Sequence, residues 1–254
     1  MRILLTNDDG LYSPGIRAVA EALAGEHELT ISAPDAERSG TAHSFTFLTV
    51  LRASETRLKG LENVPAFAVS GTPADCVKLA IGNLAPMPDL VISGINLGAN
   101  RGTDVFYSGT VAGAMEAALN GVRAIAVSNV AFPPHEFGAS IEALRCGMRL
   151  MQKDGSLTLL NINAPDTDEK NLKGCMITPL SRQCYKPRYD MRTDPYGRPY
   201  YWASREMISR SSPETDDDER WTKQGYAAIT PLLTCLCDHD AIDRLNQLMR
   251  EDAR

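Results

Sequence analysis

Two acidic residues stand side by side near the start of the chain. Asp8 and Asp9 follow an apolar run and precede Gly10 in the stretch TNDDG. Neighbouring carboxylates repel each other, so keeping both ionised costs free energy unless a cation lies between them. The alternative is that the two side chains cap the following helix or form an Asx-turn. The pair indicates a divalent metal site at the end of a strand.

The residues around this pair offer oxygen ligands. No His or Cys lies near Asp8 and Asp9 in the sequence, which disfavours a structural zinc site and favours a hard ion. Ser39, in APDAERSGTAHS, and Asn96, in SGINLGANRGTDVFYSGT, are the short polar side chains best placed to complete the set. The oxygen-rich set suits Mg²⁺, Mn²⁺ or Ca²⁺, and we predict that Asp8, Asp9, Ser39 and Asn96 hold one such ion per subunit, with Mg²⁺ or Mn²⁺ preferred.

A second group of residues is typical of an anion site. Ser108, Gly109 and Thr110 lie where a helix is expected to open, so backbone N–H groups and the positive end of the helix dipole attract a phosphate. Plain N-capping by a Ser or Thr is the common alternative. The predicted substrate-binding residues are Asn100, Ser108, Gly109 and Thr110.

The elements that must position these residues alternate along the first two thirds of the chain. The expected strands are Arg2–Thr6, Glu28–Ala33, Ala66–Ser70, Asp89–Ser93, Ala124–Ser128 and Leu157–Ile162. The expected helices include 14–25, 74–84, 110–121, 136–155 and a terminal helix over 238–252. In a parallel sheet the carboxyl ends of the strands share one edge, which brings the polar loops together.

This alternation predicts an α/β fold: a Rossmann-like, three-layer, mostly parallel sheet. After Asp166 the composition changes and becomes rich in Pro, Tyr, Arg and other charged residues. We therefore predict a core domain over 1–165 and a second unit over 166–254. The acidic run from Glu214 to Glu219 is expected to be a solvated loop.

Composition limits the partners and the compartment. The chain has 254 residues and a net charge of −6 without a basic stripe, which disfavours a nucleic-acid polymer. No stretch reaches a membrane-spanning length and no signal peptide is recognisable, so no membrane partner is expected. Six scattered cysteines without a CxxC pair indicate reduced thiols and a cytoplasmic location.

Several linked motifs resemble one family. TNDDG, APDAERSG, SGTPADCV, PDLVISGINLGAN and YSGTVAGAMEAAL occur in the order and spacing of the SurE family, and LLNINAP and GYAAITPL are similar as well. The resemblance covers Met1 to about Leu232. The chain departs from the family at Glu37, where Asn is common, and in LLTCLCDHD.

The resemblance implies a metal-dependent enzyme that hydrolyses nucleoside 5′- and 3′-monophosphates, with a second activity on polyphosphate. This is a 5′-nucleotidase, or acid-phosphatase-like phosphoric monoester hydrolase, with nucleoside monophosphates as ligands. It further implies a divalent metal at Asp8, Asp9, Ser39 and Asn96, a β-hairpin-rich C-terminal appendage, and a homodimer or homotetramer with exchanged C-terminal segments.

The expected mechanism is metal-assisted hydrolysis with Asp8, Asp9 and Asn96 as catalytic residues. Either aspartate can orient or deprotonate the attacking water, or attack phosphorus directly. The acids are contiguous rather than spaced as DxD, which favours attack by water over a phosphoaspartyl route. His43 and Asp104 are further candidates for proton transfer, although a lone His is more commonly a surface or hydrogen-bonded residue.

Two functions of other classes compete with hydrolysis. A receiver-like regulatory domain without catalytic activity also holds Mg²⁺ on paired acids, but it needs an Asp at the end of a central strand, where this chain has Ser93-Gly94. A dinucleotide-binding oxidoreductase needs a Gly-x-Gly turn where this chain has TNDDG.

Overall fold

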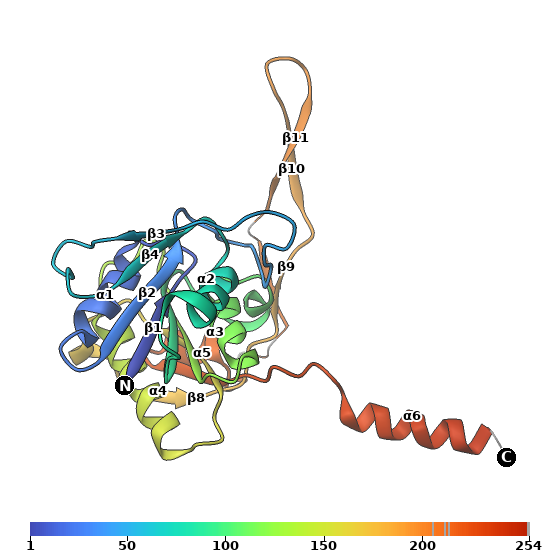
Figure 1. Cartoon of the computed structure of the whole chain (residues 1–254). Helices are drawn as coiled ribbons and strands as arrows, with labels where there is room; N and C mark the ends of the chain where they lie inside the picture. Colours follow the sequence, from blue (N-terminus) through green and yellow to red (C-terminus); the bar gives the residue numbers. More distant parts are fainter. Residues whose placement is uncertain (205, 211, 213, 253–254) are drawn as a thin grey trace.

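The structure, a computed structural model, describes residues 1–204, 206–210, 212 and 214–252. Within these residues the main body is a nine-stranded mixed sheet with helices on both faces, and a hairpin and a terminal helix project from it (Figure 1). This confirms the predicted α/β fold, its mostly parallel sheet and its hairpin.

The strands that carry the site are parallel neighbours at the centre of the sheet. The sheet has the order β3-β4-β2-β1-β5-β6-β7-β13-β8, in which β4 to β7 run parallel and β3 and β13 run antiparallel to their neighbours β4 and β7. Its strands are β1 (Arg2–Thr6), β2 (Glu28–Pro34), β3 (Ala53–Thr56), β4 (Ala66–Val69), β5 (Leu90–Leu97), β6 (Ala124–Asn129), β7 (Leu159–Ala164), β8 (Cys175–Ile177) and β13 (Ala227–Pro231).

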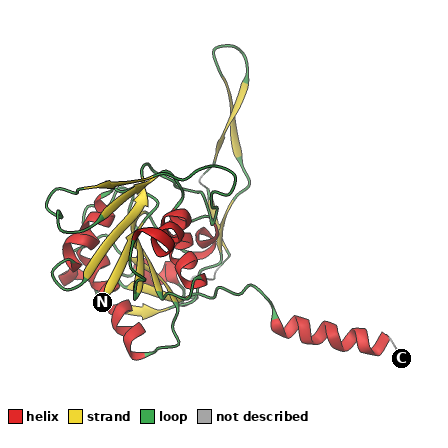
Figure 2. Ribbon diagram, viewed as in Figure 1, coloured by secondary structure: helices red, strands yellow, loops and turns green. Residues whose placement is uncertain are grey.

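Two pairs of helices cover the sheet, one pair on each face (Figure 2). The helices α1 and α4 pack on one face, and α2 and α3 on the other. The α-helices are α1 (Pro14–Leu23), α2 (Pro73–Leu79), α3 (Gly109–Leu119), α4 (Gly138–Lys153), α5 (Asp218–Lys223) and α6 (His239–Asp252). A π-helical turn η1 (Ala80–Leu84) extends α2, and 3-10 turns form η2 (Gly102–Phe106) and η3 (Glu169–Asn171).

Local sequence explains these helices. In α1 the Ser13 hydroxyl accepts from the Gly15 N–H, Pro14 opens the helix, and Ile16, Val19 and Leu23 form its buried stripe. Gly15 lets α1 approach β5, because a Cβ there would lie 1.9 Å from the Ile95 carbonyl oxygen. This contact holds α1 against the strand that carries Asn96.

The segment after Asp166 joins the same sheet before it leaves the body. The strand β13 pairs with β7, and β8 pairs with β13. A short sheet is formed by β9 (Gln183–Tyr185) with β12 (Met207–Ser209), and a long hairpin by β10 (Tyr189–Thr193) with β11 (Pro199–Ala203). The boundary after Pro165 stays a prediction, and the last two residues of the predicted second unit lie outside the described residues.

The expected solvated loop over the acidic run is correct for Glu214 to Asp216, which are exposed, and wrong from Asp217 onwards. Asp217 and Asp218 are buried: Asp217 caps α5 by accepting from the Arg220 N–H, and Asp218 opens the helix. A run of acids is solvated when nothing donates to it, whereas here backbone N–H groups satisfy both carboxylates.

None of the helices in the described part of the chain combines the length and apolar character that crossing a membrane requires.

Candidate functional site

Asp8 lies directly beyond β1, pressed against the start of α3. Its side chain is buried, and its Oδ1 accepts a short hydrogen bond from the Thr110 hydroxyl. Gly109 makes this approach possible, because a Cβ at that position would lie 2.8 Å from the Asp8 Cβ and 2.9 Å from its Oδ2. Burial raises the pKa of Asp8, while the Thr110 hydroxyl and the Gly109 and Thr110 N–H groups oppose that rise.

Asp9 is held from the other side by β5. Its Oδ2 accepts from the Leu97 N–H at 3.2 Å. Burial, and then the negative charges of Asp8 and Glu37, raise the pKa of Asp9 to about 7, against the single lowering effect of the Leu97 N–H. The turn at Gly10, with φ of +96°, lets the chain reverse immediately after the pair.

Asn96 completes this part of the site. The predicted strand continues beyond Ser93 through an irregularity in its pairing with β6, which carries Asn96 to the edge of the sheet. Its Oδ1 lies 3.4 Å from the Thr110 hydroxyl, and its Nδ2 donates to the Gly98 carbonyl at 2.7 Å. Thr110 therefore touches both Asp8 and Asn96, and the three side chains form one cluster.

Ser39 lies on the loop after β2, next to this cluster. The Arg38 N–H donates to the Asp8 carbonyl at 2.7 Å, which fixes the loop to the strand end. The Ser39 hydroxyl donates to Glu37 Oε1 at 2.7 Å. The loop is thus joined to Asp8 through its backbone, while the Ser39 side chain is bonded to Glu37.

The start of α3 has the capped geometry that its sequence indicates. The Ser108 hydroxyl accepts from the Val111 N–H at 3.0 Å, so Ser108 is the N-cap. Ser108 and Thr110 are buried beside Asp8. The N-capping interpretation holds for Ser108, and the assignment of residues 108–110 to phosphate binding stays a prediction.

Asn100 is the centre of a buried amide network. Its N–H donates to Asn163 Oδ1 at 2.8 Å, and its carbonyl accepts from the Asn161 and Asn163 amides. Its own Nδ2 donates to the Ser128 hydroxyl at 2.9 Å. These bonds tie the segment between β5 and α3 to β6 and β7. They give Asn100 a positioning role, and its predicted contact with substrate stays a prediction.

The two further candidates for proton transfer lie in structural contacts. His43 Nε2 lies 2.8 Å from Glu116 Oε2, and Lys78 Nζ lies 3.0 Å from Glu116 Oε1, so His43 anchors its loop to α3 and α2. Asp104, in η2, bonds to Tyr185 in β9, and burial raises the pKa of its carboxyl. The hydrogen-bonded interpretation of His43 is the one that the structure supports.

Asp218 is a residue that sequence reasoning missed. Its carboxylate is buried and accepts from the Gly102 N–H at 3.0 Å and from the Ser181 N–H at 2.9 Å. Nearby, Arg101 Nη1 donates to the Thr222 hydroxyl at 2.8 Å. The C-terminal segment therefore fixes the loop between Asn100 and α3. Within the run of acids no local signal distinguishes Asp218 from its neighbours.

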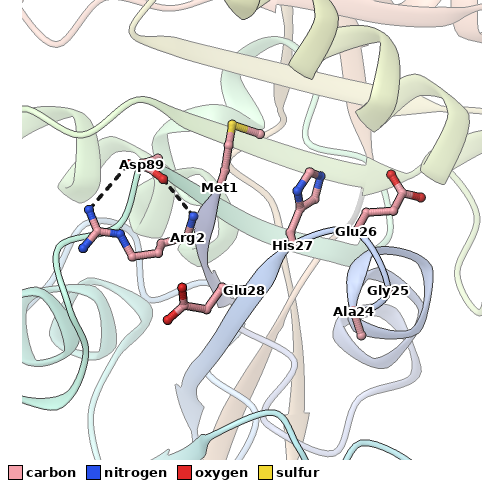
Figure 3. Close-up of a pocket in the computed structure, with 8 residues that line it drawn as sticks. All are labelled: Met1, Arg2, Ala24, Gly25, Glu26, His27, Glu28 and Asp89. Atoms are coloured by element: carbon pink, nitrogen blue, oxygen red, sulfur yellow. Dashed lines mark hydrogen bonds and ion pairs between the residues drawn. The ribbon is translucent and has the colours of Figure 1, made fainter.

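A hollow of about 530 Å³ lies at the opposite edge of the sheet and is no part of this site (Figure 3). It is lined by the amino ends of β1 and β2, whereas Asp8 follows the carboxyl end of β1, roughly 20 Å along the strand. Two of its carboxylates have partners: the Asp89 carboxylate accepts from the Arg2 N–H at 2.8 Å, and Glu26 pairs with Arg145.

The comparisons with known proteins agree with this geometry. The family model described as Survival protein SurE matches residues 3–187. The chain belongs to the SurE family. A protein named 5′-nucleotidase SurE from Pelotomaculum thermopropionicum is 43% identical over 98% of this chain and 96% of its own length. Another of that name, from Synechococcus elongatus, is 39% identical over 98% of this chain and all of its own length.

A solved structure extends the agreement to the fold. The SurE protein from Aquifex aeolicus superposes with a TM-score of 0.82 at 35% identity, covering 98% of this chain and all of that one. The coverage includes the C-terminal segment, so the SurE resemblance predicted from the motifs holds along the chain.

The donor set at the carboxyl edge fits a hard divalent ion. Asp8 and Asp9 offer carboxylate oxygens, Asn96 an amide oxygen and Ser39 a hydroxyl. Burial raises the pKa of both aspartates, so a bound cation would favour their ionised forms. No cluster of three or more His, Cys, Asp or Glu able to hold a metal occurs among the described residues.

Proposed function

We propose that this member of the SurE family is a metal-dependent phosphatase of nucleoside monophosphates, acting through Asp8 and Asp9. The observation that carries the proposal is the pair of carboxylates, Asp8 buried and Asp9 half-buried, held between β5 and the start of α3. The names of the relatives support the substrate class, since proteins covering nearly the same length are called 5′-nucleotidases. A receiver-like regulatory domain is not favoured.

We assign the metal to Asp8, Asp9, Ser39 and Asn96, as one Mg²⁺ or Mn²⁺ ion per subunit. When bound, such an ion polarises a phosphoryl oxygen and offsets the charge of the transferring group. The Ser39 hydroxyl donates its proton to Glu37, which leaves the lone pairs of its oxygen available to a metal ion.

The chain's own groups supply the remaining chemistry. Leu97 fixes Asp9 through Oδ2, which leaves Oδ1 as the atom that accepts a proton from the attacking water. The water oxygen bonds to phosphorus as the bond from phosphorus to the ribose oxygen breaks. The proton held at Asp9 returns through solvent to the ribose oxygen, so the net reaction adds water across that bond. The N–H groups that open α3 stabilise the charge on the phosphoryl oxygens.

The same site is proposed to accept 5′- and 3′-monophosphates and the terminal phosphate of polyphosphate. We also propose a cytoplasmic location, since all six cysteines lie in the described part of the chain and are free thiols.

We further propose a homodimer or homotetramer with exchanged C-terminal segments. The β10–β11 hairpin and α6 project from the body and expose apolar side chains, among them Tyr189, Trp202 and Leu245. Apolar area of this kind is covered in stable assemblies.

The catalytic proposal is tested with Asp8→Asn and Asp9→Asn. Each removes a charge but keeps the shape of the side chain, so kcat/KM for AMP with Mn²⁺ or Mg²⁺ should fall by about 100-fold or more while the circular dichroism spectrum is unchanged. Asp216→Asn, at an exposed carboxylate, is the matched control. Phosphate release that persists at full rate in excess chelator, or in either variant, would contradict the proposal.

A further inference from the structure

An exposed aromatic side chain stands beside the candidate site on a loop that no catalytic assignment uses. Phe132 follows β6 and is 70% exposed. A Cβ placed on Gly98 would lie 4.0 Å from the Phe132 Cβ and 4.0 Å from Asn96 Nδ2. Phe132 and the Asn96 amide therefore lie on either side of Gly98, each within contact distance of a side chain placed at that position.

The loop that carries Phe132 is fixed at both ends. Asn129 Oδ1 accepts from the Ala131 N–H at 3.0 Å, and Asn129 Nδ2 donates to the Glu136 carbonyl at 2.7 Å. The Asp166 carboxylate, beyond β7, accepts from the Glu136 N–H at 2.9 Å. Two prolines follow Phe132 and limit the backbone further. These bonds fix the backbone of the loop that carries Phe132.

Asn129 also bonds to Gly98, next to the candidate site. The Asn129 carbonyl accepts from the Gly98 N–H at 3.0 Å, and the Gly98 carbonyl accepts from Asn96 Nδ2. One short chain of hydrogen bonds therefore links Asn96 to the Phe132 loop. Exposing a large apolar ring to water costs free energy. Stacking of a flat apolar face of a ligand on the ring removes that cost.

We infer that Phe132 is the stacking surface for the base of the nucleotide. This rests on the proposed function, in which Asp8, Asp9 and Asn96 meet the phosphate. In a nucleotide, one ribose ring separates the base from the phosphate. In the protein, the position of Gly98 separates Phe132 from Asn96, with the Phe132 Cβ and Asn96 Nδ2 each 4.0 Å from a Cβ placed there. Stacking tolerates every base, because each has a π-face, and it favours the larger purines.

The test compares substrates with and without a base. For wild type and Phe132→Ala, kcat/KM is measured with AMP and with ribose 5-phosphate. The ratio of the two values should fall at least fivefold in Phe132→Ala, the factor that corresponds to about 1 kcal/mol of stacking, through a rise in the KM for AMP. Phe132→Trp should keep the ratio, and Phe132→Leu should lose most of it.

An inhibition measurement isolates the base from the phosphate. Adenosine should inhibit wild-type hydrolysis of ribose 5-phosphate, with an inhibition constant at least fivefold weaker in Phe132→Ala. Met87→Ala removes a half-exposed apolar side chain near the amino end of β5 and is the matched control for both measurements.

The two proposals fail in different ways. A wild-type chain that releases phosphate from neither substrate contradicts the proposed function. A wild-type chain that hydrolyses both, with an unchanged ratio and an unchanged adenosine constant in Phe132→Ala, overturns the stacking role alone.

Discussion

Asp8 and Asp9 are neighbours in the chain but are held by different groups. Asp8 bonds to a hydroxyl at the start of α3, and Asp9 bonds to the backbone of β5. Burial raises the pKa of both side chains, and the charge of Asp8 adds to the rise at Asp9. Keeping this pair ionised therefore costs the folded protein free energy, and the proposed divalent ion would offset that cost.

This cost predicts how stability depends on pH without metal. Unfolded, Asp9 has a pKa near 3.8, whereas in the folded chain it is about 7. Between these values the folded state binds more protons than the unfolded state, so the contribution of Asp9 to stability falls as pH rises through this window. In chelator, Asp9→Asn should flatten the decline in melting temperature between pH 5 and 7.5. An equal slope in wild type and variant would contradict this.

The same linkage predicts the effect of metal. Protons compete with the ion for these carboxylates, so the rise in melting temperature on adding Mn²⁺ should be larger at pH 8 than at pH 5.5. Differential scanning calorimetry with and without chelator measures both. A metal-induced rise that is larger at the lower pH would argue against binding at the aspartates.

At the scale of elements, the start of α3 and the carboxyl end of β1 are packed too closely for any side chain but hydrogen at Gly109. A residue in the first turn of a helix normally gains from Gly→Ala, because alanine has the higher helix propensity. Here the added carbon would meet Asp8, so packing outweighs propensity.

Gly109→Ala should therefore destabilise the chain by about 1–3 kcal/mol and strongly reduce kcat, since Asp8 must move. Chemical denaturation gives the first value and phosphate release the second. Gly82→Ala is the matched control, because nothing lies within 4 Å of a Cβ added there. A Gly109→Ala variant with wild-type stability and activity would show that α3 does not confine Asp8.

The element α5 reaches across the fold through Asp218. The segment between β5 and α3 contains the short 3-10 turn η2, and Asp218 accepts from the Gly102 N–H at its start. The C-terminal segment is thus part of the support of the site.

Asp218→Ala leaves the Gly102 and Ser181 N–H groups buried without this acceptor, at a cost of about 1–3 kcal/mol. We expect a lower midpoint of chemical unfolding and a lower kcat/KM for AMP. Asp216→Ala, two residues away and exposed, should change neither. Equal behaviour of the two variants would remove α5 from the support of the site.

At the scale of the whole molecule, two segments extend beyond the body and carry apolar side chains into solvent (Figure 1). In α6 the exposed apolar residues Ile242, Leu245 and Leu248 recur at a spacing of three and form one stripe. A stripe of this kind is stable when another surface covers it, and the proposed exchange of C-terminal segments would provide one.

Replacing both Leu245 and Leu248 with Glu should lower the oligomeric state measured by light scattering after gel filtration, because charge on the stripe opposes its burial. Asn246→Glu adds charge next to the stripe and should leave the mass unchanged. A wild-type chain that is monomeric, or a double variant of wild-type mass, would contradict exchange through α6.

The sequence determined the elements whose residues repeat with a regular period. The range of β1 agrees with the structure, and the predicted helices agree within a few residues with α1, α3 and α4. The types of ligand at the edge of the sheet, and the order of motifs that assigns the family, are also properties of the linear chain. Local periodicity encodes these features because each depends on neighbours a few residues away.

Tertiary structure decided what depends on residues distant in the chain. The polar strand β3 exists only as an antiparallel partner of β4, and its exposed residues carry no burial pattern. Asp218 meets Gly102 across 116 positions, and Phe132 meets the Asn96 region through Asn129. The path of the whole chain sets these contacts, so no local run of residues could predict them.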